Sequence, residues 1–173
     1  FLLDADKEYL VTGQLGTSTD SGDADGLILV ENKPVKLEQS HLNNVLARFE
    51  GKIQQIPPMY SALKHKGRRL YELAREGIEV PREPRSVTIH SLSLEKIQGS
   101  KLTLKINCSK GTYIRTLIED IAQELGTIAH VTQLRRLGVG PFSKTQMVVM
   151  RKIEAAAADG MQAIDSLLLP VDD

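Results

Sequence analysis

Apolar residues recur every three or four positions in two segments of the chain, which is the spacing of a helix with one buried face. This pattern predicts a helix over residues 38–49 and another over residues 113–125, which Gly126 ends. Shorter helices are expected at Leu70 to Ala74, just beyond a Lys66-Gly67 turn, and, in an alanine-rich stretch, near residues 154–158. Both long helices have an apolar face that another layer of the fold must cover.

Elsewhere apolar and polar residues alternate, as they do in strands with one buried side. The expected strands cover residues 7–13, 86–98, 101–108 and 129–139. Gly99-Ser100, between the second and the third, predicts a tight hairpin. A uniformly apolar run at 27–30 follows a long polar loop and is typical of a buried strand. Strands outnumber helices and neighbours fit antiparallel pairing, so the expected class is α+β, with a mixed, mainly antiparallel sheet flanked by helices.

Residues 50–85 interrupt this alternation and are bracketed by prolines. At their centre is the basic run KHKGRR, Lys64 to Arg69, which holds four fixed positive charges around a Lys66-Gly67 turn. We expect this segment to project from the core as an insertion. Such a run is often only solvated surface, but cations on a projecting hairpin can also neutralise the phosphates of RNA.

The composition of the 173 residues, 41% hydrophobic and 25% charged, is that of one globular domain with an ordinary core. No uncharged apolar run is long enough to cross a membrane. The single cysteine and the lack of a signal-peptide pattern are what a cytoplasmic protein is expected to show. The net charge is zero, yet the basic run lies apart from the acidic run Asp20 to Gly26. This separation is typical of proteins that bind nucleic acid.

Three familiar motifs fit the sequence poorly. Six residues separate Cys108 from Arg115, one more than a phosphatase loop allows, so Cys108 is interpreted as a small core residue. In a calcium loop aligned on Gly26, the first and twelfth positions would be Ser21 and Asn32, and neither supplies a carboxylate. The four histidines are not spaced as metal ligands. We therefore expect no metal site.

Arg115 has an unusual position, two residues after Tyr113 and in the first turn of the helix predicted over residues 113–125. The free N–H groups of a first turn carry partial positive charge and disfavour a cation there. We therefore expect a negative group from outside the helix to face Arg115.

Four blocks follow one another along the chain: DKEYLVTGQLGTSTDSGDADG, IPPMYSALKHKGRRLYELAREGIEVPRE, CSKGTYIRTLIEDIAQELG and AHVTQLRRLGVGPF. Together they closely resemble the bacterial TruB-type tRNA pseudouridine-55 synthases, over about Phe1 to Pro170. The resemblance implies a partial pseudouridine synthase-like catalytic domain that flips the T-loop uridine of tRNA out of its stack and isomerises it to pseudouridine. It also implies a monomer that binds the T arm and needs neither cofactor nor metal.

The resemblance assigns roles residue by residue. Tyr9 corresponds to the aromatic residue that packs on the target uracil, and Arg115 to the arginine that pairs with the catalytic aspartate. Tyr113 and Leu134 resemble residues that line the base pocket. The implied RNA-binding residues are Asp23 and, in the projecting segment, Lys64, Lys66, Arg68 and Arg69.

Two blocks of the family, GALDPLATG with the nucleophilic aspartate and KPxGxTS, are not found in the 173 residues. We also expect the family's small C-terminal RNA-binding domain to be missing. The chain alone is therefore expected to be inactive, although its parent protein is active. The alternative is a non-catalytic RNA-binding module or a tRNA-folding chaperone that uses the same basic surface.

Overall fold

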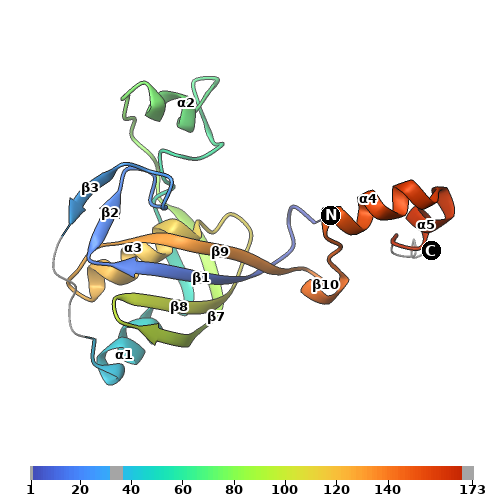
Figure 1. Ribbon diagram of the computed structural model, residues 1–173. Helices are drawn as coiled ribbons and strands as arrows, with labels where there is room; N and C mark the ends of the chain where they lie inside the picture. Colours follow the sequence, from blue (N-terminus) through green and yellow to red (C-terminus); the bar gives the residue numbers. More distant parts are fainter. Residues whose placement is uncertain (1, 32–36, 169–173) are drawn as a thin grey trace.

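Six strands form an antiparallel sheet at the centre of the computed structural model, which describes residues 2–31 and 37–168 (Figure 1). The strands lie in the order β10-β9-β1-β8-β7-β4. Their bounds are β1 Lys7–Leu15, β4 Gly51–Gln55, β7 Arg85–Gln98, β8 Lys101–Cys108, β9 Ala129–Val139 and β10 Phe142–Ser143. Every neighbouring pair is antiparallel, so the expected α+β class is confirmed.

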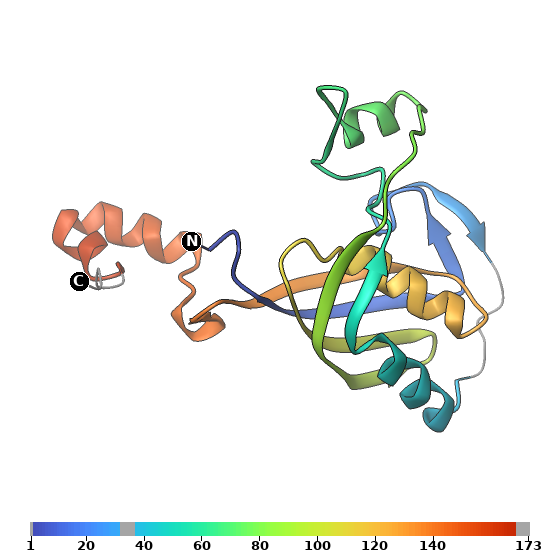
Figure 2. The same cartoon turned by 180° about the vertical axis from the view of Figure 1, so that it is seen from behind.

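Two helices, α1 (Gln39–Phe49) and α3 (Ile114–Glu124), cover one face of this sheet (Figure 2). Their apolar sides and the inner side chains of the strands form one core, in which Val11, Ile106 and Leu117 are fully buried. Burial of each such side chain stabilises the fold by roughly 1.5–3 kcal/mol. The core thus holds α3, and with it Arg115, in a fixed position against the sheet.

The close approach of α3 to β1 depends on a glycine. A Cβ atom at Gly13 would lie 2.7 Å from Cγ2 of the buried Ile118. Side chains in a packed core cannot yield by that amount without strain. Gly13 therefore sets how deeply α3 lies on the sheet.

Residues 56–84 leave the sheet between β4 and β7 and project from it; we call this segment the thumb (Figure 1). It contains the hairpin strands β5 (Lys64–His65) and β6 (Arg68–Arg69) and the helix α2 (Leu70–Arg75). Lys66 and Gly67 have φ angles of 49° and 87° and form the turn predicted there. The first residues of the expected insertion instead belong to the main sheet, because β4 pairs with the start of β7.

At the edge of the sheet opposite β4, β9 continues into an arm that carries the C-terminal elements away to the side of the core (Figure 1). The arm contains β10, the 3₁₀ helix η1 (Lys144–Gln146), α4 (Met150–Asp159) and α5 (Met161–Asp165). The alanine-rich helix expected near residues 154–158 is the second half of α4.

A small separate sheet pairs β2 (Thr17–Thr19) with β3 (Ile28–Glu31). The apolar run at 27–30 does form a strand, but the prediction that it is buried is wrong. The exposed fractions of Leu27, Ile28 and Leu29 are 76%, 64% and 64%. In the described part of the chain β3 pairs with β2 only, outside the main core, and an apolar run does not by itself show what covers it.

The other predicted elements agree closely with the structure. The helix predicted over residues 113–125 is α3, and the strands predicted over 101–108 and 129–139 are β8 and β9. Cys108 is fully buried and burial raises the pKa of its thiol, so its interpretation as a small core residue is confirmed. Among the described residues, no helix is both long enough and apolar enough to cross a membrane.

Candidate active site

The guanidinium of Arg115 is bound at the N-terminal end of α3 by two other segments of the chain. Its Nη1 donates to the carbonyl oxygen of Ser21 at 2.8 Å and to Oδ2 of Asp23 at 2.7 Å. Its Nη2 donates to the carbonyl oxygen of Tyr60 at 2.7 Å. The side chain is only 23% exposed, so these bonds are partly shielded from water. Among the described residues Nε and the second Nη2 hydrogen form no hydrogen bond.

Asp23 supplies the negative group that the position of Arg115 requires. The resemblance pointed instead to the aspartate of a block that the 173 residues do not contain, so the sequence did not predict this pair. Asp23 Oδ1 accepts hydrogen bonds from Ser21 Oγ at 2.7 Å and from the backbone N–H of Asp25 at 3.2 Å. Burial works to raise the pKa of Asp23, but the bond from Ser21 and the charge of Arg115 outweigh it and lower that pKa. The Asp23 carboxylate is therefore ionised at neutral pH.

The loop that carries Asp23 is attached to the main sheet. The backbone N–H of Val131 donates to the carbonyl of Gly22 at 2.9 Å, and Asp23 forms an isolated bridge with the same residue of β9. Gly22 has a φ of +73°, and a Cβ atom there would lie 2.8 Å from Oε1 of Glu119. The Glu119 carboxylate, at the end of a flexible side chain, could move aside, but the positive φ strongly favours glycine, so the path of the loop past α3 depends on it.

A buried glutamine anchors the start of α3. Gln55 is 2% exposed, its Oε1 accepts from the backbone N–H of Tyr113 at 2.8 Å, and its Nε2 donates to the Tyr113 carbonyl at 3.1 Å. Tyr113 is the N-cap residue, and none of its side-chain atoms caps the helix. Gln55 thus satisfies the N–H of the N-cap residue, one of the backbone groups that a helix leaves without an intrahelical partner. Nothing in the local sequence indicated it, because the two residues lie 58 positions apart.

Arg115 and Asp23 open onto a cavity of about 440 Å³ that also contacts Leu134. The structure therefore brings together three of the residues singled out from the sequence. Tyr9 and Tyr113 do not line this cavity. Tyr9 lies on β1 opposite Arg136, whose guanidinium carbon is 5.5 Å from the centre of the Tyr9 ring. Leu134 lies on the same strand as Arg136 and pairs with Val11, two residues after Tyr9 on β1.

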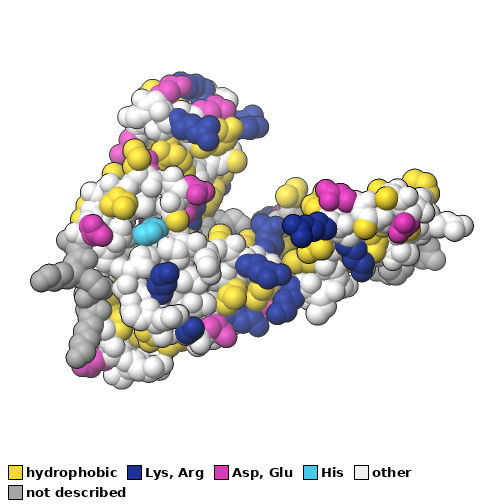
Figure 3. Space-filling view, viewed as in Figure 1, with side chains coloured by type: hydrophobic (Ala, Val, Ile, Leu, Met, Phe, Trp, Pro, Cys, Tyr) yellow, Lys and Arg dark blue, Asp and Glu magenta, His cyan; other side chains and the backbone are white. Residues whose placement is uncertain are grey.

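The basic residues of the thumb lie away from this cavity, on the projecting hairpin. Figure 3 shows Lys and Arg side chains over the thumb and over the junction between the sheet and the arm. Lys64, Arg68 and Arg69 belong to β5 and β6, and Lys66 forms the turn between them. Arg69 Nη1 donates to the hydroxyl of Tyr71 at 2.9 Å, and Arg68 forms an ion pair with Glu76.

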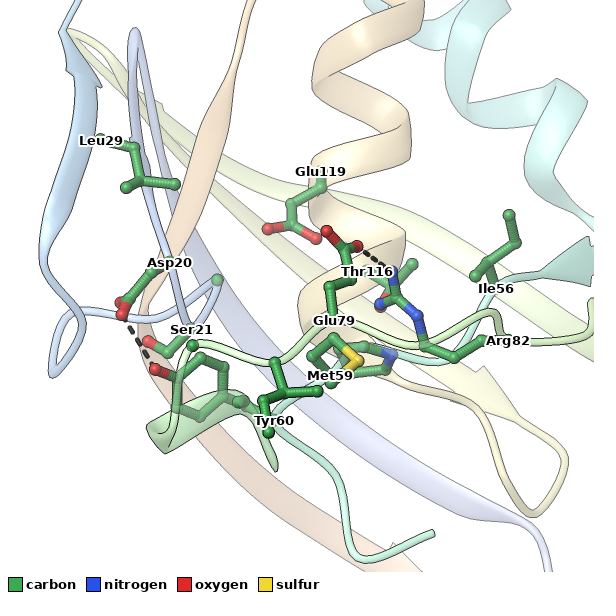
Figure 4. Close-up of a pocket in the computed structure, with 15 residues that line it drawn as sticks. Asp20, Ser21, Leu29, Ile56, Met59, Tyr60, Glu79, Arg82, Thr116 and Glu119 are labelled. Carbon is green, nitrogen blue, oxygen red and sulfur yellow. Dashed lines mark hydrogen bonds and ion pairs between the residues drawn. The ribbon is translucent and has the colours of Figure 1, made fainter. Parts of the chain in front are cut away.

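Glu119 projects from α3 into a second cavity, of about 460 Å³, which the Tyr60 phenol and Asp20 border (Figure 4). Burial and, to a smaller extent, the charge of Asp120 raise the pKa of Glu119 to about 7, while the charge of Arg115 opposes the shift. Among the described residues there is no group of three or more His, Cys, Asp or Glu that could hold a metal ion.

The raised pKa of Glu119 makes the stability of the fold depend on pH. Between about pH 4.5 and pH 7 the folded chain holds a proton that the unfolded chain has lost, so stability decreases as pH rises through this window. Glu119→Gln should therefore raise the midpoint of thermal unfolding at pH 8 by about 2–4 °C, or ~1 kcal/mol, and should change it little at pH 4. Thermal unfolding followed at both pH values measures this. Glu154→Gln, on an exposed position of α4, is the control; an equal shift in both variants would contradict the prediction.

Comparison with known proteins decides the family. Residues 1–114 match the model described as "TruB family pseudouridylate synthase (N terminal domain)". The chain belongs to the TruB family of pseudouridylate synthases. Residues 115–173 match the "tRNA pseudouridylate synthase B C-terminal domain", so the resemblance found in the sequence is confirmed.

Several TruB proteins are similar to nearly the whole chain. A tRNA pseudouridine synthase B from Ectopseudomonas mendocina is 51% identical over 99% of the chain, and one from Shewanella sp. (strain MR-7) is 48% identical over the same share. The match covers 56% of the length of each relative. The chain thus spans little more than half the length of the curated relatives that it matches.

Solved structures share the fold at lower sequence identity. The crystal structure of a Cbf5-Nop10-Gar1 complex superimposes with a TM-score of 0.71 at 23% identity, over 97% of this chain and 42% of the other. An H/ACA RNP bound to a substrate RNA containing 2'-deoxyuridine gives a TM-score of 0.66 at 20% identity, over 98% and 41%. These matches show a shared fold. The roles of individual site residues stay predictions.

Proposed function

We propose that the protein to which this chain belongs isomerises the T-loop uridine of tRNA, position 55, to pseudouridine. The observation that carries this proposal is the guanidinium of Arg115, held by fixed acceptors beside a cavity in a TruB family chain. Such a group can orient and neutralise the carboxylate nucleophile that the family resemblance implies.

The reaction breaks the bond between the uracil nitrogen and the sugar. It then forms a bond between the sugar and a carbon atom of the uracil ring. The base must first leave its stack and be held in a pocket. In our proposal Tyr9 packs on the extruded uracil, which is worth roughly 1–3 kcal/mol for such stacking contacts, and Leu134 and Tyr113 line the pocket. Arg136, which lies over the Tyr9 ring, supports the orientation of that ring.

The nucleophile is proposed to be an aspartate outside these 173 residues. A buried carboxylate without a partner would take up a proton and lose its nucleophilic form. Arg115 suits this task because an arginine stays charged and can bind a carboxylate through two N–H groups. Its Nη1 is already engaged by Asp23 and Ser21, so Nε and the remaining Nη2 hydrogen are the donors that would bind the nucleophile.

The substrate is proposed to be tRNA, held at its T arm and T loop by Lys64, Lys66, Arg68 and Arg69 of the thumb. Four cations on a projecting hairpin support phosphate binding. Asp23 is proposed to contact RNA on its cavity side. We further propose that the protein acts as a monomer in the cytoplasm and needs no cofactor.

The chain alone is expected to bind RNA without modifying it. The full-length protein and the 173-residue chain are each incubated with T-arm RNA, and pseudouridine is measured together with RNA binding. Turnover is expected for the full-length protein only, because the nucleophile is supplied by sequence outside the chain. Pseudouridine formed by the chain alone would place the nucleophile within it and overturn our assignment; no turnover by the full-length protein would overturn the proposed function.

A further inference from the structure

Tyr60 lies at the base of the thumb and makes two contacts with the site. Its carbonyl oxygen accepts a hydrogen bond from Nη2 of Arg115 at 2.7 Å. Its phenol donates to Oδ2 of Asp20 at 2.9 Å, as Figure 4 shows. The backbone and the side chain of one residue therefore reach two different parts of the site.

These contacts close a ring of interactions. Asp20, which accepts the phenol of Tyr60, also accepts from the backbone N–H of Leu27 through its Oδ1 at 2.8 Å. Asp20 and Leu27 are the two ends of the loop that carries Asp23, and Asp23 binds Nη1 of Arg115. The ring therefore runs from Arg115 through Tyr60 and Asp20 to the loop, and through Asp23 back to Arg115.

The backbone just after Tyr60 is hydrogen-bonded to α2, the helix of the thumb. The residue after Tyr60, Ser61, is 5% exposed, and its carbonyl accepts from the backbone N–H of Tyr71 in α2 at 3.1 Å. The backbone N–H of Leu70 donates to the carbonyl of Leu63 at 2.8 Å in the same way. A displacement of α2 would therefore also displace the backbone at Tyr60, whose carbonyl oxygen binds Arg115.

We propose that Tyr60 is a positioning residue that couples the seating of the thumb on RNA to the orientation of Arg115. This inference rests on the proposed function and adds a residue to it. The phenol holds the Tyr60 carbonyl at its distance from Arg115 by fixing the backbone against Asp20. When the thumb closes on the T arm, the guanidinium is locked, with its remaining donors directed at the nucleophile.

The two contacts can be separated by substitution. The bond to Arg115 comes from the main chain, so Tyr60→Phe leaves that acceptor in place and removes only the link to Asp20. The ring of the side chain is retained, which keeps its packing. Asp20→Ala breaks the same link from the other side, together with the bond that Asp20 accepts from the Leu27 N–H.

The kinetic test uses the full-length protein and T-arm RNA. We expect Tyr60→Phe to lower the single-turnover rate constant by about tenfold, equivalent to ~1.4 kcal/mol, and to change the dissociation constant for RNA by less than about twofold. Asp20→Ala should lower the rate constant at least as much, because it also removes the acceptor of the Leu27 N–H. The control Ser93→Ala also removes a bond from a hydroxyl to a carboxylate, 3.2 Å long, on a remote exposed part of β7, and should change neither quantity. A rate constant equal to that of the control, or a loss confined to RNA affinity, would overturn the proposal.

A second measurement does not depend on turnover. Amide hydrogen exchange is followed in residues 20–27 and at the base of the thumb, with and without T-arm RNA. RNA should slow exchange in both segments of the wild-type protein, but only at the thumb in Tyr60→Phe. Equal protection of residues 20–27 in both proteins would rule out the coupling. If the wild-type protein shows this coupled protection but forms no pseudouridine, the proposed reaction fails while the coupling stands.

Discussion

Replacing Arg115 with alanine in the full-length protein will abolish pseudouridine formation and leave tRNA bound almost as tightly as before. We expect the single-turnover rate constant to decrease about 100- to 1,000-fold, because removal of one positioned group that stabilises charge at the reacting centre has effects of that order. The dissociation constant should change by less than about threefold, since most binding energy comes from phosphate contacts elsewhere. Arg115→Lys should also be impaired, because an ammonium group cannot bind Asp23, two carbonyls and a nucleophile in one plane.

Arg48 provides a matched control for this experiment. It is an exposed arginine whose Nη1 pairs with Glu124 at 2.6 Å on the helical side of the sheet. Exposed pairs of this kind contribute little, so Arg48→Ala should keep both rate and affinity. If Arg115→Ala instead weakens tRNA binding in proportion to its loss of activity, the residue is an RNA contact. A non-catalytic RNA-binding module or a tRNA-folding chaperone would then be the better interpretation.

Replacing the four thumb cations together, Lys64, Lys66, Arg68 and Arg69, by alanine will weaken tRNA binding and reduce its dependence on salt. Each lost phosphate contact should lower the slope of log affinity against log salt by roughly 0.7–0.9. Arg68 already pairs with Glu76, so we expect a total reduction of about 2–3 and a dissociation constant roughly ten- to hundredfold higher at physiological salt. Binding measured over a series of salt concentrations gives both quantities.

A control with the same change of charge separates local contacts from net charge. Arg48, Lys52, Lys96 and Lys101 are exposed and lie outside the thumb and the site. Their joint replacement by alanine should change the salt slope by much less than the thumb variant does. Equal slopes in the two variants would mean that the thumb cluster is solvated surface and acts only through total charge.

Much of the fold followed from the sequence because its signals are local. The period of apolar residues located α3 and β9 to within one residue, and a glycine-containing turn located the hairpin of β7 and β8. Four sequence blocks also identified the TruB family, which the family models confirm. In each case the informative residues are neighbours along the chain.

The partners of the site residues were decided only by the tertiary structure. Asp23 lies 92 residues from Arg115, Tyr60 lies 55 residues from it, and Gln55 reaches Tyr113 across 58 residues. The exposed run at 27–30 shows the same limit, because its apolar character does not reveal what packs on it. The sequence alone determined which elements form and to which family they belong. How the charges are paired and buried depends on contacts between distant segments, and those contacts exist only once the sheet and α3 have packed together.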